Sequence, residues 1–235
     1  MTERRRDAVL RSAESLAIGP SALRWRENHL EIDIDEVCSP WPSRIRGVVR
    51  VFPRNLNMRD VRLDGAGRHL WRPIAPSARV EVELTYPAAH WAGEGYLDAN
   101  CGDAPLEESF ARWDWSRACR DGETRVLYDI AGRNGEETNL ALRFDSSGQA
   151  QDFDPPPIVD LPPTAWRIGR TTRSEGVGQA HILRALEDGP FYARSLVSTQ
   201  FDGRPIVAMH ETLSLDRFAS GWIKALLPFK MPRAF

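Results

Sequence analysis

Hydrophobic and polar residues alternate along most of this chain, with the two-residue period of a β-strand that has one buried face. The alternation is clearest at residues 30–35, 79–86 and 139–144. Shorter stretches predict further strands at residues 45–52, 111–118, 124–130, 166–173, 180–187, 191–200 and 205–212. The sequence therefore predicts an all-β fold built from antiparallel strands.

Turn signals separate these segments. They are the pairs Asp64-Gly65, Asp121-Gly122, Asn134-Gly135, Asp188-Gly189 and Asp202-Gly203. Aspartate, asparagine and glycine tolerate the positive φ angles of tight hairpin turns. Short strands joined by such turns at intervals of about 8–15 residues favour a sandwich or a barrel over a parallel sheet with crossover helices.

Two segments show a helical period instead. One covers residues 1–17 and is expected to end at Gly19-Pro20, and the other covers residues 214–227. A proline-rich stretch at residues 154–163 is either a linker between domains or a long loop inside one, and the sequence leaves both readings open. The length of 235 residues suffices for one large domain or two smaller ones, each with its own core.

The composition is that of a globular protein, with 42% hydrophobic residues, 27% charged residues and a net charge of −2. The hydrophobic content excludes a disordered chain, and no apolar run approaches the roughly 20 residues of a membrane-spanning helix. A net charge near zero argues against general nucleic-acid binding. The histidines are scattered and the cysteines form no CxxC spacing, so we expect no metal site.

Residues 69–119 hold the strongest candidate for chemistry. Tryptophans gather there, at Trp71, Trp91, Trp113 and Trp115. If the chain is extended in this window, Tyr96, Asp98 and Asn100 point to the same side. A carboxyl group would then lie between a phenol and an amide, close to several indole rings.

Such surroundings suit one kind of acid chemistry. A carboxyl group among aromatic rings loses hydration, which raises its pKa and lets it act as a general acid near neutral pH. Aromatic rings also stabilise a nearby cation by about 0.5–2 kcal/mol each. These properties favour protonation of an alkene to a carbocation. In the alternative interpretation the tryptophans are core residues, and Asp98 is a turn or cap residue in a glycine-rich strand end.

Longer segments carry more specific patterns. They are Ile32-Asp33-Ile34-Asp35-Glu36, Trp71-Arg72-Pro73-Ile74-Ala75-Pro76, Gly95-Tyr96-Leu97-Asp98-Ala99-Asn100-Cys101-Gly102, Trp113-Asp114-Trp115-Ser116-Arg117, Phe191-Tyr192-Ala193-Arg194 and His210-Glu211-Thr212-Leu213-Ser214. Together these segments resemble the carotenoid 1,2-hydratase (hydroxyneurosporene synthase) family over nearly the whole chain. The resemblance implies an enzyme of bacterial carotenoid synthesis that adds water across the C1–C2 double bond of acyclic carotenoids, of the neurosporene or lycopene type, without a cofactor.

The resemblance also implies roles for individual residues. Asp98 would protonate the alkene to give a tertiary carbocation, which water then captures. Tyr96 matches the same motif, and His69 and Trp71 match a preceding His-x-Trp pair that shapes or stabilises the site. We expect further side chains to bind the substrate, namely Trp91, Trp113, Trp115 and Asn100. Two positions depart from the family pattern, since Leu97 and Cys101 stand where a histidine and a tryptophan are usual.

The architecture implied by the resemblance is a pair of calycin-like (lipocalin-related) antiparallel barrels in tandem, with short terminal helices. We expect the first barrel in residues 1–103 and the second in residues 104–235. Family members usually carry a further N-terminal segment ahead of the matching part, so the first barrel is expected to be incomplete.

An acyclic carotenoid dissolves in membranes, so the enzyme has to meet a bilayer. Residues 219–235 combine apolar and aromatic side chains with Lys224, Lys230 and Arg233, a composition typical of an interfacial segment. They could equally form a helix on the second barrel with a basic tail. We expect peripheral attachment at the cytoplasmic side of the inner or intracytoplasmic membrane, and the sequence leaves the oligomeric state open.

Two other functions remain open at this point. One is a lipocalin-like carrier that binds a carotenoid or another lipid without turnover. The other is a glycosidase that uses Asp98 with Glu94 or Glu107, because tryptophan-lined sites also suit sugars.

Overall fold

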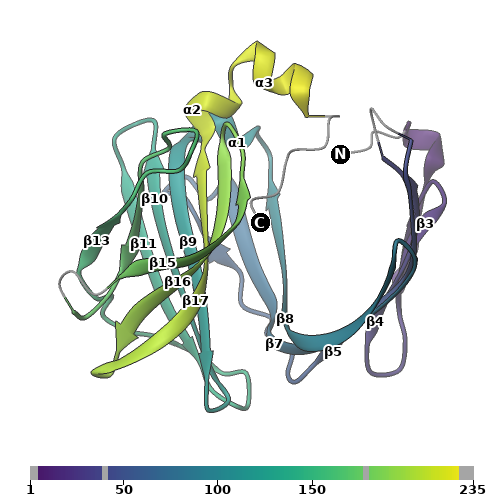
Figure 1. Cartoon of the computed structure of the whole chain (residues 1–235), viewed down its shortest axis with the longest axis horizontal. Coiled ribbons are helices and arrows are strands. Elements are labelled where there is room, and N and C mark those ends of the chain that lie inside the picture. Colours follow the sequence, from purple (N-terminus) through teal and green to yellow (C-terminus); the bar gives the residue numbers. More distant parts are fainter. Residues whose placement is uncertain (1–4, 39–41, 177–179, 228–235) are drawn as a thin grey trace. The chain divides into compact units, whose positions relative to one another are not determined.

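The computed structural model describes residues 5–38, 42–176 and 180–227. Its regular structure is almost entirely antiparallel β-strand with a few short helices (Figure 1), which confirms the all-β prediction. The described residues divide into two compact units. Unit 1 takes the residues up to Leu56, Ala75–Leu97 and those from Leu226 on, whereas unit 2 takes Asn57–Ile74 and the residues from Asp98 to Ala225.

Two long strands carry the chain from one unit to the other. Strands β7 (His69–Tyr86) and β8 (Ala88–Gly102) pair with each other, and each has one end in unit 1 and the other in unit 2. The tandem barrels, and a domain boundary between residues 103 and 104, stay predictions.

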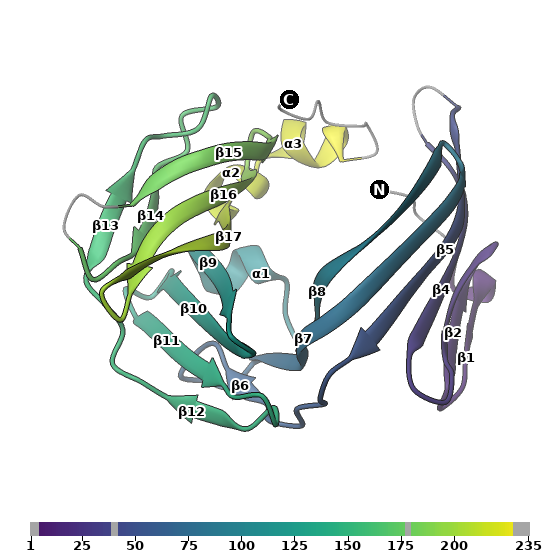
Figure 2. The ribbon, with the colours of Figure 1, turned by 60° about the horizontal axis from the view of Figure 1, so that its bottom comes forward.

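Unit 1 is built on an antiparallel sheet (Figure 2) in the order β1-β2-β3-β4-β5-β7, with β8 paired to β7. The strands not yet introduced are β1 (Val9–Arg11), β2 (Ser15–Ile18), β3 (Ser21–Trp25), β4 (Leu30–Val37) and β5 (Arg44–Pro53). Val51, Ala75 and Ala78 form a buried cluster, and Leu97 of β8 packs against it.

The predicted helix at residues 1–17 is wrong for the residues described. Only Arg6–Ala8 form a short 3-10 turn (η1), and the following residues form β1 and β2. Ile18 pairs with Val9 in one hairpin and with Ser21 in the next. Pairing in the sheet outweighs the weak helical period, because a short helix is only marginally stable without tertiary support.

Unit 2 contains a second antiparallel sheet (Figure 1) in the order β12-β11-β10-β9-β17-β16-β15. Its strands are β9 (Phe110–Arg120), β10 (Glu123–Gly132), β11 (Glu137–Phe144), β12 (Ala150–Asp152), β15 (His181–Asp188), β16 (Tyr192–Phe201) and β17 (Arg204–Ser214). Strands β13 (Ile158–Leu161) and β14 (Arg170–Arg173) form a separate pair, and β6 (Val61–Arg62) pairs with the unit 2 end of β7. The strand predicted at 166–173 is therefore limited to its last four residues.

Two predicted hairpin turns are confirmed by their backbone angles. Asp121 and Gly122 have φ angles of 51° and 80°, and Asp202 and Gly203 have φ angles of 52° and 67°. Two successive positive angles are what a tight two-residue turn requires.

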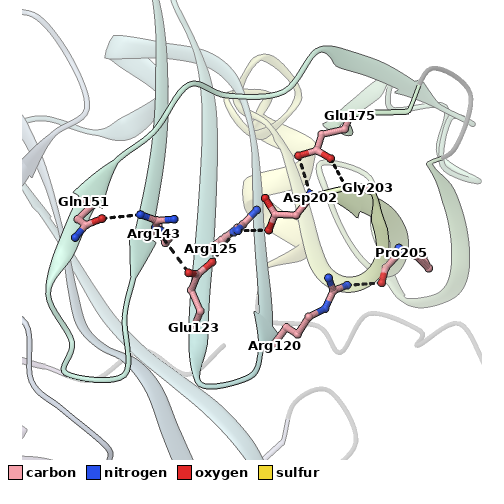
Figure 3. A network of polar contacts seen from close by, with 9 residues as sticks. All are labelled: Arg120, Glu123, Arg125, Arg143, Gln151, Glu175, Asp202, Gly203 and Pro205. Atoms are coloured by element: carbon pink, nitrogen blue, oxygen red, sulfur yellow. Dashed lines mark hydrogen bonds and ion pairs between the residues drawn. The ribbon is translucent and has the colours of Figure 1, made fainter.

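A polar network fixes one of these turns at the end of the second sheet (Figure 3). The Glu175 carboxylate accepts hydrogen bonds from the backbone nitrogens of Asp202 and Gly203, each at 2.8 Å. Arg125 of β10 donates to the carboxylates of both Glu123 and Asp202. The network therefore ties the β16–β17 turn to β10.

One face of the second sheet carries a buried polar cluster around Asp114 and His210. The buried Asp114 carboxylate accepts from the hydroxyls of Thr171, at 3.0 Å, and Thr212, at 2.6 Å. His210 Nε2 lies 2.7 Å from the Thr171 carbonyl oxygen, to which it donates. Desolvation raises the pKa of Asp114 and lowers the pKa of His210. Because side chains alternate along β9, Trp113 and Trp115 belong to the opposite face of the sheet from Asp114.

The proline-rich stretch is a loop of unit 2 rather than a linker. Arg173 donates to the Pro156 carbonyl at 2.7 Å, and Arg170 donates to the Pro162 carbonyl at 2.7 Å. Arg173 also forms an ion pair with Asp129 of β10, with Nη2 at 2.7 Å from Oδ1. These contacts hold the loop and the β13–β14 pair to the second sheet.

The helix predicted at residues 214–227 is confirmed as two short helices, α2 (Leu215–Phe218) and α3 (Gly221–Leu226). Ile223 of α3 is buried, and Lys224 Nζ lies 2.6 Å from the Glu107 carboxylate, which belongs to the short helix α1 (Leu106–Ser109). Trp222 is exposed.

Residues 228–235 of the predicted interfacial segment lie outside the described residues. No helix in the described part of the chain is long and apolar enough to cross a membrane.

Candidate functional site

A hydrogen bond between Trp71 and Asp98 is the centre of the candidate site. The indole Nε1 of Trp71 donates to Oδ2 of Asp98 at 2.8 Å. Trp71 lies near the start of β7 and Asp98 near the end of β8, so antiparallel pairing of these strands brings the two side chains together. Trp71 is only 1% exposed and has little freedom to turn away.

An aromatic cluster extends from the Trp71 ring and is formed by Trp71, Tyr128, Trp113 and Phe110. The rings of Trp71 and Tyr128 meet edge to face, with centroids 5.8 Å apart, and Trp113 meets Tyr128 in the same way at 5.7 Å. This is the geometry that aromatic quadrupoles prefer. Burial, with smaller contributions from the charges of Asp98 and Glu211, raises the pKa of Tyr128, so its phenol stays protonated.

His69 belongs to the other end of this aromatic cluster. Its Nε2 lies 2.8 Å from the Ser109 hydroxyl, and its ring centroid is 4.8 Å from that of Phe110. A Cβ atom added to Gly102 of β8 would lie 2.5 Å from His69 Nδ1, so only glycine lets the backbone approach this closely. The predicted His-x-Trp pair therefore has two different partners: Trp71 holds Asp98, and His69 holds Ser109.

The other predicted residues are placed as follows. Trp115 is buried on the same sheet face as Trp113 and is paired in register with Tyr128. Tyr96 and Asn100 lie two residues before and after Asp98 on the continuous strand β8, which places all three side chains on one face. Trp91 belongs to unit 1 and is 53% exposed. The roles assigned to all these residues stay predictions.

Three residues of the site carry no signal in the sequence analysis, namely Ser109, Phe110 and Tyr128. Tyr128 lies in a segment that alternation correctly predicts as a strand. Its place beside Trp71 depends on how β10 pairs with β9, which a pattern within one strand does not reveal.

The carboxylates considered for a glycosidase are both engaged by cations. Glu94 lies 2.7 Å from Arg54, and Glu107 lies 2.6 Å from Lys224, which lowers the pKa of Glu107. Within the part of the chain that the structure describes, no group of three or more histidine, cysteine, aspartate or glutamate side chains could hold a metal ion.

Comparison with protein families decides where the chain belongs. Residues 1–235 match the family described as Carotenoid hydratase CrtC. The chain belongs to this family. It is 52% identical over 234 residues to the acyclic carotenoid 1,2-hydratase of Thiocapsa roseopersicina and 44% identical over 234 residues to that of Rubrivivax gelatinosus. Each match covers 99% of this chain and 58% of the relative, so the chain spans little more than half of either relative.

The fold of this carotenoid hydratase family member has a counterpart among solved structures. A crystal structure from Nitrosomonas europaea, provisionally assigned as AttH, superimposes with a TM-score of 0.58 at 16% identity and covers 88% of this chain and 72% of that protein. At this identity the likeness concerns the fold alone, and it agrees with the β-rich architecture predicted from the sequence.

The two departures from the carotenoid hydratase pattern lie away from the carboxylate of Asp98. Leu97 packs against Val51, Ala75 and Ala78 in the core of unit 1. Leu97 and Cys101 are each an odd number of residues away from Asp98 on β8, so their side chains point to the face opposite Asp98. The hydrogen bond from Trp71 to Asp98 is thus compatible with both departures.

Proposed function

We propose that this protein hydrates the C1–C2 double bond of an acyclic carotenoid, of the neurosporene or lycopene type. The observation that carries the proposal is the hydrogen bond from Trp71 to Asp98 beside an aromatic cluster, in a chain that belongs to the carotenoid hydratase family. Relatives named acyclic carotenoid 1,2-hydratase support the substrate class.

In the proposed mechanism Asp98 is the general acid. Trp71 donates to Oδ2, which fixes the orientation of the carboxyl group that supplies the proton. That proton is transferred to C2 of the substrate, the π electrons of the double bond form the new C–H bond, and a tertiary cation remains at C1. The faces of neighbouring aromatic rings stabilise this cation by about 0.5–2 kcal/mol each. Water then binds C1 and loses a proton to complete the addition.

An assay of the wild-type chain tests the proposal against the carrier alternative. The protein is incubated with neurosporene or lycopene in detergent, and the extract is analysed by chromatography and mass spectrometry. We expect a product that has gained one water as a 1-hydroxy group. Quenching of tryptophan fluorescence without any such product would instead identify a carotenoid-binding protein without turnover.

A peripheral position at the cytoplasmic side of the inner or intracytoplasmic membrane forms part of the same proposal. The substrate dissolves in lipid, and α3 exposes Trp222 while Ile223 anchors the helix to unit 2. We expect Trp222→Ala to lower sedimentation with anionic lipid vesicles by roughly fivefold. The variant loses about 1 kcal/mol of binding free energy, because it no longer buries an indole in the lipid. The matched control is Trp166→Ala, which removes another exposed indole of unit 2. Equal losses in the two variants would remove the membrane role of α3.

A further inference from the structure

A row of side chains crosses the second sheet and links the candidate site to a second carboxylate. In register, Arg194 of β16 faces Glu211 of β17, Glu211 faces Trp115 of β9, and Trp115 faces Tyr128 of β10. These strands lie side by side in Figure 1. Residues that face one another across strands share one face of a sheet. Glu211 and Tyr128 therefore lie on the same face, two strands or about 10 Å apart across the sheet.

This row reaches Asp98 through Tyr128. The Tyr128 ring meets the ring of Trp71, which holds Asp98. Both Asp98 and Glu211 act electrostatically on the buried Tyr128 phenol. The aromatic cluster therefore has one carboxylate on the Trp71 side and another on the β17 side.

Glu211 has the properties of a fixed, charged and hydrated carboxylate. Arg194 Nε lies 2.9 Å from Glu211 Oε1, so the guanidinium holds the carboxylate in place. The Arg194 guanidinium in turn lies 5.7 Å from the centre of the Tyr192 ring, which limits its movement. The Tyr192 phenol also hydrogen-bonds to the Glu211 carboxylate. The Glu211 side chain is 26% exposed, so water can reach this carboxylate.

The proposed reaction needs a group of this kind. Once Asp98 has given its proton to C2, water must approach C1, and the resulting oxonium must lose a proton. An oxonium is a far stronger acid than any carboxylic acid, so even an ion-paired carboxylate can accept this proton. What the site has to supply is orientation of the water at the moment when the cation exists.

We propose that Glu211, held by Arg194, is a second catalytic residue that orients the attacking water and accepts its proton. The inference rests on the proposed hydratase function and adds to it. The C1–O bond forms from a water lone pair, one O–H bond of the oxonium breaks, and its proton goes to the Glu211 carboxylate. Exchange with solvent later returns a proton to Asp98 and removes one from Glu211, so no other reactant is consumed.

Reaction in D2O separates the role of Glu211 from that of Asp98. If water capture fails after protonation, the cation loses a proton and returns to an alkene that carries deuterium. We expect Glu211→Gln to form hydrated product about tenfold or more slowly. We also expect the ratio of deuterium in recovered carotenoid to hydrated product to rise at least about fivefold. If the ion pair were purely structural, its loss would lower deuterium incorporation and hydrated product together and leave their ratio unchanged.

Two further variants make the test specific. Glu123→Gln is the matched control, because Glu123 is a partly exposed carboxylate paired with Arg125 at 2.7 Å and lies in the polar network of Figure 3. It is expected to keep the wild-type ratio. Glu211→Asp keeps a carboxylate and is expected to give a ratio closer to that of the wild type than Glu211→Gln does.

The outcomes distinguish this inference from the proposed function. A wild-type chain that gives neither product nor exchange overturns the hydratase function and the role of Glu211 with it. A wild-type chain that hydrates its substrate, with an unchanged ratio in Glu211→Gln, overturns the role of Glu211 alone. Equal ratios in Glu211→Asp and Glu211→Gln also overturn it, since the carboxylate would then make no difference.

Discussion

The Asp98→Asn variant is expected to bind an acyclic carotenoid and to hydrate it about 100-fold to 10,000-fold more slowly than the wild type, the range that general acids contribute. The amide has nearly the shape of the carboxyl group, and its oxygen can still accept the hydrogen bond from Trp71. What it lacks is a proton acidic enough for an alkene. Rate is measured as formation of hydroxylated product, and binding as quenching of tryptophan fluorescence.

A neighbouring carboxylate supplies the control for this experiment. Asp103 lies just beyond the unit 2 end of β8, and it is exposed and paired with Arg68 at 3.1 Å. Asp103→Asn is expected to keep the wild-type rate. If Asp98→Asn keeps more than about a tenth of that rate, Asp98 is not the acid. In D2O, Asp98→Asn should also leave the recovered carotenoid free of deuterium, because no cation forms.

The largest expected effect on stability comes from the ion pair that joins β14 to β10. Arg173 and Asp129 are only 8% and 16% exposed, and Arg173 also donates to the Pro156 carbonyl. Arg173→Met would leave the Asp129 carboxylate buried without its cation, so we expect a loss of about 3–5 kcal/mol in the free energy of unfolding. In thermal denaturation this corresponds to a decrease in Tm of roughly 10 °C.

Two comparisons test the physical reason for this effect. Arg59→Met breaks an exposed ion pair with Asp152 in the same unit and is expected to cost less than about 1 kcal/mol. The double variant Arg173→Met/Asp129→Leu also removes the unpaired Asp129 carboxylate. It is expected to recover part of the stability lost by Arg173→Met. Equal losses in Arg173→Met and Arg59→Met would show that burial of the pair is not what matters.

The sequence predicts those features of the fold that repeat locally. Alternation finds β4, β5 and the second half of β7 in the first sheet, and all strands of the second sheet except β12. It does not find β3 or β8. Paired Asp-Gly signals find the turns at 121–122 and 202–203. The sequence prediction fails at residues 9–18, where a weak helical period competes with the pairing of β1 to β2 and of β2 to β3, which only the folded sheet supplies. The proline-rich stretch could be assigned to unit 2 only after its carbonyls were seen to accept from Arg170 and Arg173.

The candidate site likewise contains residues that the sequence predicts and residues that only the structure reveals. Trp71 and Asp98 stand out because tryptophan, glycine and family motifs surround them in the sequence, and the structure joins them by a hydrogen bond. Tyr128 lies on a strand without such motifs, and Glu211 lies in the family segment at 210–214, to which the sequence analysis assigns no role. Their relation to Trp71 follows from the pairing of β9 with β10 and β17, which is a property of the sheet and not of any one segment.

The path of β7 and β8 limits which insertions and deletions the family can accept between Trp71 and Asp98. The chain leaves unit 2 after Ile74 and returns at Asp98, so the tip of this long hairpin lies far along the chain from the Trp71–Asp98 pair. A side chain on a strand changes face with every residue of shift. Loss or gain of a single residue between Trp71 and Asp98, unless a bulge absorbed it, would turn the carboxylate away from the indole. Changes of two residues would preserve the orientation, so evolution should tolerate insertions and deletions in this segment mainly in pairs.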